Sequence, residues 1–141
     1  DININFKESD INLDNTKFYS DKFGEIEFYK SKLQSNEGLA TLSSKIRIKI
    51  KDKDIFHKSF LIPKKARKKI KNLIFDISFQ LDNRSININK ILFEDENSKI
   101  KNFDTIDQII ENNNQVKYDY FNPILFRKFI KEIIIIYSQE G

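Results

Sequence analysis

The chain has 141 residues and a formal net charge of +4 at pH 7, with no cysteine and no methionine. This length is sufficient for one domain with a hydrophobic core. The lack of cysteine excludes disulfides, thiolate nucleophiles and zinc–thiolate sites, and no run of about 18 apolar residues is present to span a membrane. Because methionine is absent even at position 1, we expect the chain to be a fragment of a longer protein.

Alternating apolar and polar residues predict several short strands at the start of the chain. Ile2, Ile4 and Phe6 show the two-residue period of a strand whose two faces differ. Further short strands are predicted at residues 10–15, 16–20 and 24–28, with a brief one around Leu33 before a turn at 35–38.

Residues 39–51 predict one long strand. Ile46, Ile48 and Ile50 alternate there with lysine and arginine side chains. One face of this strand is therefore expected to be apolar and the other charged.

Residues 73–81 and 85–93 predict a β-hairpin, because two alternating runs flank a polar stretch with turn chemistry at 82–85. The alternating apolar positions that we single out are Phe75, Ile77 and Phe79 in the first strand and Ile86 and Ile88 in the second.

Between these strands the apolar period changes to that of a helix. Ile55, Phe56, Phe60 and Leu61 are helix-spaced, and Pro63 suits the first position of a further helical turn. We therefore predict a helical insertion over residues 55–71, with a short helix near 55–70.

Two more helices are predicted near residues 103–112 and 123–138. The first has acidic residues in its first turn, and the second begins with Asn122 as a cap and Pro123 at the first helical position. Residues 133–136 are also compatible with a buried strand, but the apolar spacing favours a helix. The apolar stripe of this helix consists of Phe126, Phe129, Ile130, Ile133, Ile134 and Tyr137.

The predicted fold is mainly β, of the α+β class: an antiparallel meander sheet with one apolar face and short helices. Residues 1–93 would form the sheet with its helical insertion, and residues 94–141 a helical C-terminal segment packed on the sheet. If the short helices leave part of the apolar face uncovered, that part forms a groove; where they cover it, the same residues are core.

The sequence offers no set of catalytic residues. His57 is the only histidine and has no ligand-spaced partners, so we expect a solvated or capping role. The acidic cluster at 94–96 lacks the glycine and the ligand series of a calcium loop. We therefore expect a non-enzymatic protein with no metal and no cofactor.

A basic cluster follows the helix-spaced residues. It has three interpretations: a solvated surface, an amphipathic element on anionic lipid, or a phosphate-binding surface for nucleic acid. Nucleic acid is disfavoured because no DNA- or RNA-binding motif accompanies the cluster and the second half of the chain is acidic. The cluster comprises Lys58, Lys64, Lys65, Arg67, Lys68, Lys69 and Lys71.

Several stretches together resemble the C-terminal region of the AsmA-like proteins of Gram-negative envelopes, which are related to TamB and YhdP. The resemblance covers residues 2 to about 93 and is looser in the tail at 137–141. It is carried by residues 10–18 (DINLDNTKF), 23–26, 46–50, 56–65 (FHKSFLIPKK) and 74–91.

This resemblance implies a periplasmic protein held in the inner membrane by an N-terminal segment that is not in this chain. It also implies outer-membrane assembly or phospholipid handling through an apolar β-groove, without catalytic residues. Phospholipid or a membrane surface would be the partner, together with other envelope proteins.

From the residues, the candidate lipid-binding strip is Ile46, Ile48, Ile50, Phe75, Ile77, Phe79, Ile86 and Ile88, and the candidate headgroup patch is Lys64, Lys65, Arg67, Lys68 and Lys69. Two other functions compete with lipid handling. One is a protein-interaction module that docks through Phe126, Phe129, Ile133 and Tyr137; the other is a nucleic-acid-binding domain that uses residues 64–71.

Overall fold

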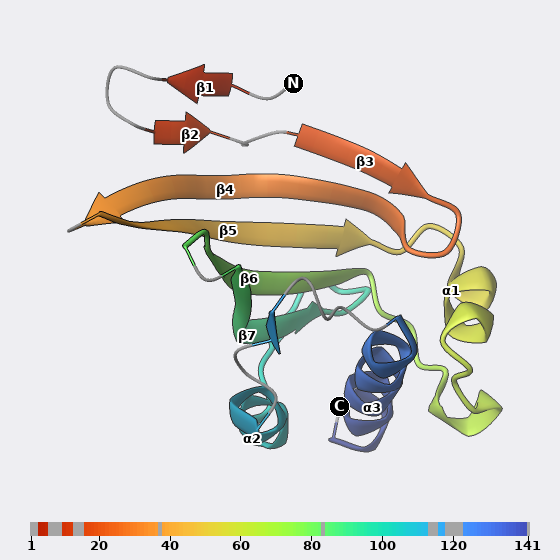
Figure 1. The fold of residues 1–141 in the computed structure, drawn as a ribbon. Coiled ribbons are helices and arrows are strands. Elements are labelled where there is room, and N and C mark those ends of the chain that lie inside the picture. Colours follow the sequence, from red (N-terminus) through yellow and green to blue (C-terminus); the bar gives the residue numbers. More distant parts are fainter. Residues whose placement is uncertain are drawn as a thin grey trace.

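A computed structural model describes residues 3–5, 10–12, 16–36, 38–82, 84–112, 116–117 and 123–140. Within these ranges, seven strands form one antiparallel sheet, and six of them are joined in the order β3-β4-β5-β6-β7-β8 (Figure 1). The predicted antiparallel meander and α+β class are confirmed. The strands are β3 (Thr16–Ser20), β4 (Gly24–Asn36), β5 (Leu39–Lys49), β6 (Asn72–Gln80), β7 (Ser85–Glu94) and β8 (Ile100–Lys101), with β9 (Val116–Lys117) paired to β7 and a separate pair of β1 (Asn3–Asn5) and β2 (Asp10–Asn12).

The helical insertion is shorter than predicted. It contains helix α1 (Lys53–Ser59) and a single 3-10 turn, η1 (Lys64–Ala66), in place of one helix near 55–70. Asp52 caps α1 by accepting a hydrogen bond from the backbone N–H of Ile55 at 3.1 Å. Leu61 then adopts a left-handed conformation with φ of 54°, which ends the helix before Pro63.

The two C-terminal helices lie close to their predicted places: α2 spans Asp104–Asn112 and α3 spans Pro123–Glu140. The helical interpretation of residues 133–136 is therefore confirmed. The predicted cap at Asn122 lies outside the described residues.

Strand β4 is one continuous strand, although the sequence predicted separate strands at 24–28 and around Leu33. Its pairing with β5 passes from Phe28↔Ile46 to Lys30↔Lys45, so Tyr29 is an extra, bulged residue. The bulge changes the parity of the side chains that face each side of the sheet. Leu33 therefore lies on the same face as Phe28 despite the odd spacing between them.

Strand β7 contains a second bulge, at the same level of the sheet. Its pairing with β6 passes from Asp76↔Lys90 to Ile77↔Ile88, which leaves Asn89 as the extra residue. The odd-numbered Ile91 and the even-numbered Ile88 consequently lie on the same apolar face.

The hydrophobic core lies between the apolar face of the sheet and the helices. Ile130, Ile133 and Ile134 of α3 are at most 1% exposed, and they pack in one cluster with residues of β5, β6 and β7. Helices α1 and α3 lie toward one end of the sheet and α2 lies beside β7, whereas the far ends of β4 and β5 extend away from α1 and α3 (Figure 1). The helices therefore seal part of the apolar face only.

We predict that Gly24→Ala destabilises the protein strongly. Gly24 has φ of +101°, and an added Cβ would lie 2.1 Å from the backbone oxygen of Lys49. Strain and a backbone clash together should lower the free energy of unfolding by about 3 kcal/mol, measured by urea denaturation.

The matched control is Gly38→Ala. Gly38 also has a positive φ, of +82°, but no atom lies within 4 Å of its added Cβ. Only the conformational cost of about 1 kcal/mol is expected there. Equal losses in the two variants would contradict the proposed clash with β5.

Candidate functional site

The structure divides the predicted lipid-binding strip into two parts. Ile48, Ile50, Phe75 and Ile77 are at most 8% exposed and belong to the hydrophobic core. A ligand cannot reach these four side chains, because they lie against the helices and neighbouring strands. Their assignment to an open groove is therefore corrected: they are structural residues.

The other four residues of the strip remain partly accessible: Ile46, Phe79, Ile86 and Ile88 are half-buried. Their apolar surface is not continuous, however. Ser31 and Ser44 face each other across β4 and β5 with their Oγ atoms 2.8 Å apart, and Ser44 is 2% exposed. This pair of hydroxyl groups, of which Ser44 is buried and Ser31 half-buried, interrupts the apolar strip that an acyl chain would need.

The apolar stripe of α3 is used inside the protein. Ile133 and Tyr137 are buried, while Phe126 and Phe129 pack against the same core. The Tyr137 ring stacks on Phe93 with centroids 4.8 Å apart. The predicted docking surface on this stripe is therefore wrong for Ile133 and Tyr137, because their side chains are already covered.

The basic segment at 64–71 lies at the surface but is fixed by buried residues. Ala66 and Ile70 are at most 4% exposed, and Arg67 donates through its Nε to the backbone oxygen of Ile62 at 3.0 Å. Arg67 therefore holds the segment in place and is only half exposed. The exposed side chains of the predicted headgroup patch are Lys64, Lys65, Lys68 and Lys69.

Leu61 protrudes beside these lysines in an unusual conformation. The N–H of Leu61 donates to the oxygen of Lys58 at 3.1 Å, and the N–H of Ile62 donates to the oxygen of His57 at 2.9 Å. This is the Schellman arrangement at a helix C-terminus, where glycine usually occupies the left-handed position. A leucine in that position costs about 1 kcal/mol, and its side chain is 61% exposed.

Exposed apolar and basic side chains thus share one end of the molecule. We call this surface the basic edge and define it as Ile55, Lys58, Leu61, Lys64, Lys65, Lys68 and Lys69, all of which are exposed. Ring contacts of Phe126 with Phe23 and Phe60 bring the first turn of α3 close to the end of α1. The exposed Ile124 and Leu125 therefore lie at the same end.

His57 is buried, whereas the sequence analysis expected a solvated or capping role. It is 4% exposed, it packs edge-on against Phe56, and its Nε2 has no hydrogen-bond partner. Burial lowers the pKa of His57 below 6.5, and the nearby Arg67 guanidinium lowers it further. The imidazole is therefore a neutral packing group beneath the basic edge.

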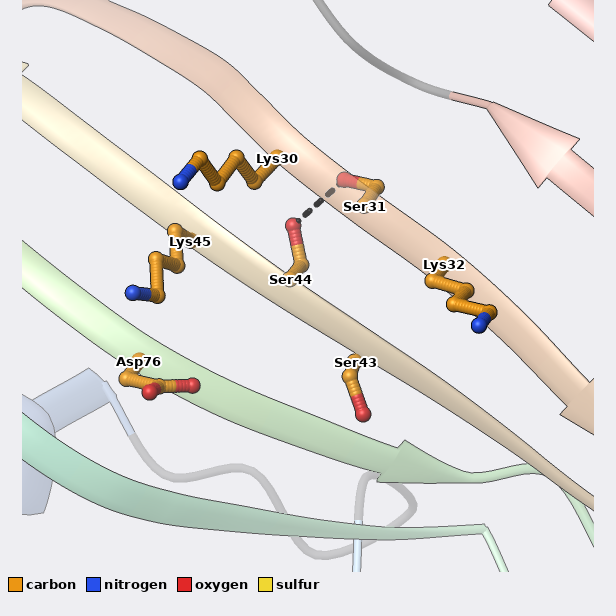
Figure 2. Close-up of a pocket in the computed structure, with 7 residues that line it drawn as sticks. All are labelled: Lys30, Ser31, Lys32, Ser43, Ser44, Lys45 and Asp76. Carbon is orange, nitrogen blue, oxygen red and sulfur yellow. Dashed lines mark hydrogen bonds between the residues drawn. The ribbon is translucent and has the colours of Figure 1, made fainter.

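The polar face of the sheet carries a second basic group that the sequence analysis did not single out. Lys30, Lys32 and Lys45 line a shallow cavity of about 430 Å³ together with Ser43 and Asp76, and Ser31 and Ser44 complete the lining (Figure 2). The sequence contains one indication of this group: the apolar residues of this stretch are even-numbered up to Phe28, whereas the next one, Leu33, is odd-numbered. A bulge there turns Lys30 and Lys32 onto the polar face.

In the part of the chain that the structure describes, no group of three histidine, aspartate or glutamate side chains is placed to hold a metal ion. None of the helices described is both long and apolar enough to cross a membrane. No family model, curated protein or solved structure matches this chain.

We predict that the protein loses stability as the pH falls from 7.5 to 5. The unfolded chain binds a proton at His57 near pH 6.5, whereas the folded protein, with its lowered pKa, resists that proton. The stabilisation is therefore complete above pH 6.5 and declines below it. Unfolding in urea at a series of pH values measures this slope.

His57→Gln should remove most of the slope between pH 5 and 7, because the chain has one histidine and the carboxylates titrate mainly below pH 5. A titration of the His57 ring by NMR gives the pKa directly. A midpoint at or above 6.5 in the folded protein would contradict the buried, neutral state.

Proposed function

We propose that this chain is a non-catalytic module that binds the surface of an anionic phospholipid membrane through its basic edge. The observation that carries the proposal is Leu61, a large apolar side chain held outward at the cost of backbone strain. Strained residues persist where the surrounding structure and the function require them. Lys64 and Lys65 follow directly after it in the chain and are exposed.

Charge complementarity supports a membrane as the occupant of this surface. Each lysine near an anionic leaflet contributes about 1 kcal/mol, and the effect decays within a Debye length. A protruding leucine adds up to about 1.5–3 kcal/mol when it is buried among acyl chains. Leu61 with its neighbouring lysines thus combines the two contributions that peripheral membrane binding requires.

A wider role in phospholipid handling is a proposal that rests on the resemblance to AsmA-like proteins. The uncovered part of the apolar face, with Phe79, Ile86 and Ile88, offers partial contacts for an acyl chain. The interrupted strip favours contact with a lipid surface over enclosure of a whole acyl chain. The AsmA-like identity, the periplasmic location and the inner-membrane anchor stay predictions.

Nucleic-acid binding is the competing function for the same lysines. Phosphate contacts alone would give binding that falls steeply with salt and does not depend on Leu61. The role of the leucine therefore separates the two functions.

We expect Lys64, Lys65, Lys68 and Lys69, all changed to Gln, to weaken binding to phosphatidylserine-containing vesicles at low salt. The expected loss is at least about tenfold, because roughly 1 kcal/mol is removed for each lysine that faces the membrane. Co-sedimentation with vesicles measures it. The control with the same change of net charge replaces Lys17, Lys49, Lys51 and Lys99, which are also exposed; equal losses would point to net charge alone and refute the basic edge.

Leu61→Gly separates binding from folding. Glycine suits the left-handed position, so the free energy of unfolding should stay within about 1 kcal/mol of the wild type. Vesicle binding should fall by roughly tenfold, because the inserted apolar side chain is lost. Leu39→Gly removes an equally exposed leucine, also 61%, at the far end of the sheet and should leave binding unchanged. Undiminished binding by Leu61→Gly would exclude membrane insertion at this site.

A further inference from the structure

The two β-bulges concentrate positive charge at one level of the polar face. The bulge at Tyr29 directs Lys30 and Lys32 onto this face, and the bulge at Asn89 places Lys90 opposite Asp76. Across the sheet the pairing is Lys30↔Lys45, Lys45↔Asp76 and Asp76↔Lys90. Four strands thus contribute one row of three lysines and one aspartate, with Lys32 beside it. Bulges that redirect side chains in this way are over-represented next to functional sites.

This arrangement is electrostatically unfavourable without a bound anion. Lys30 and Lys45 are directly opposite each other, and like charges in that position destabilise a sheet by about 0.2–1 kcal/mol. Asp76 offsets part of the charge, but among the described residues it forms no ion pair with a lysine. The row therefore keeps a net positive charge that an anionic ligand would neutralise.

The cavity provides space and additional hydrogen-bonding groups for such a ligand. Its volume of about 430 Å³ falls within the range of roughly 300–1,000 Å³ for small-ligand sites. The Ser43 hydroxyl lies on its wall; the amino groups of Lys30 and Lys45 lie on one side of the cavity, and that of Lys32 lies on the other (Figure 2). Beside it, the Asn89 amide donates to the Ser78 hydroxyl at 2.8 Å, which orders the neighbouring polar surface.

The limits of the charged patch favour a compact anion over a long chain. On one side the strands carry Glu25 and Glu27, which pair with Lys17 and Arg47. On the other side the row consists of uncharged residues: Gln34, Thr41, Gln80 and Ser85. A nucleic-acid strand needs a continuous basic track and free aromatic faces. The Tyr29 ring is already covered by the Arg47 guanidinium at 4.6 Å.

We propose that the cavity formed by Lys30, Lys32, Lys45 and Asp76, with Lys90 at its margin, binds a compact anion that carries two or more phosphate groups. The lysine ammonium groups act as point charges for phosphate oxygens, and the Ser43 hydroxyl donates a hydrogen bond. This site is separate from the basic edge, so it does not depend on the membrane-binding function.

The test is titration calorimetry of the whole chain with inorganic tripolyphosphate. The wild type should bind, and Lys30→Gln and Lys45→Gln should each weaken binding by about tenfold. Lys49→Gln is the matched control, because Lys49 is exposed on the same face of the same strand but outside the cavity; its affinity should change less than about twofold. Asp76→Asn should raise the affinity by a factor of about two to five, since it removes the only negative charge of the cavity.

Vesicles identify the source of the phosphate. In the background of the four basic-edge substitutions, binding to vesicles that contain a phosphatidylinositol bisphosphate, if it depends on Lys45, would assign the site to a lipid headgroup. Binding of tripolyphosphate alone would assign it to a soluble ligand, and both results support the site.

Three results would overturn the proposal: no heat of binding with tripolyphosphate, equal loss of affinity in Lys49→Gln and Lys45→Gln, or tighter binding of a single-stranded oligonucleotide than of tripolyphosphate. The last of these would assign the polar face to nucleic acid.

Discussion

The structure depends on the two-residue period of the strands and on the two places where a bulge resets it. In β4 and β7 the apolar residues change parity along the chain, and a regular strand would turn half of them to water. The bulges at Tyr29 and Asn89 restore one continuous face. The same two residues that keep Leu33 and Ile88 with the apolar side chains bring Lys30 and Lys90 to the polar side. Core formation and the basic cavity are thus consequences of one constraint.

The helices close the apolar face only where they pack on it. Ile133 and Ile134 of α3 belong to the same core cluster as residues of β5, β6, β7 and α1. The far ends of β4 and β5 extend past α1 and α3 (Figure 1). The apolar face is therefore a core at one end and a partly exposed surface at the other, and the Ser31–Ser44 hydroxyl pair lies on that face.

The two candidate surfaces differ in their physical character. The basic edge combines lysines with a protruding leucine and is formed by α1 and the chain that connects α1 to β6. The cavity is built of strand residues and contains lysines with hydroxyl groups but no large apolar side chain. The first suits an interface between water and hydrocarbon, and the second suits a hydrated polyanion. Neither surface depends on His57, which is buried and neutral.

The sequence by itself determined the local elements and the fold class. The alternation in residues 73–93, the long strand that ends near Lys49 and the helix after Pro123 all follow from periodicity and turn chemistry, and the structure agrees. It also located the exposed lysines at 64–69. Only the tertiary structure decided which apolar residues are covered, because periodicity gives a shared face but not the helices that pack on it. The tertiary structure also decided which charged residues form the cavity. Lys30, Lys45, Asp76 and Lys90 are far apart in the chain and come together only through the register of the strands.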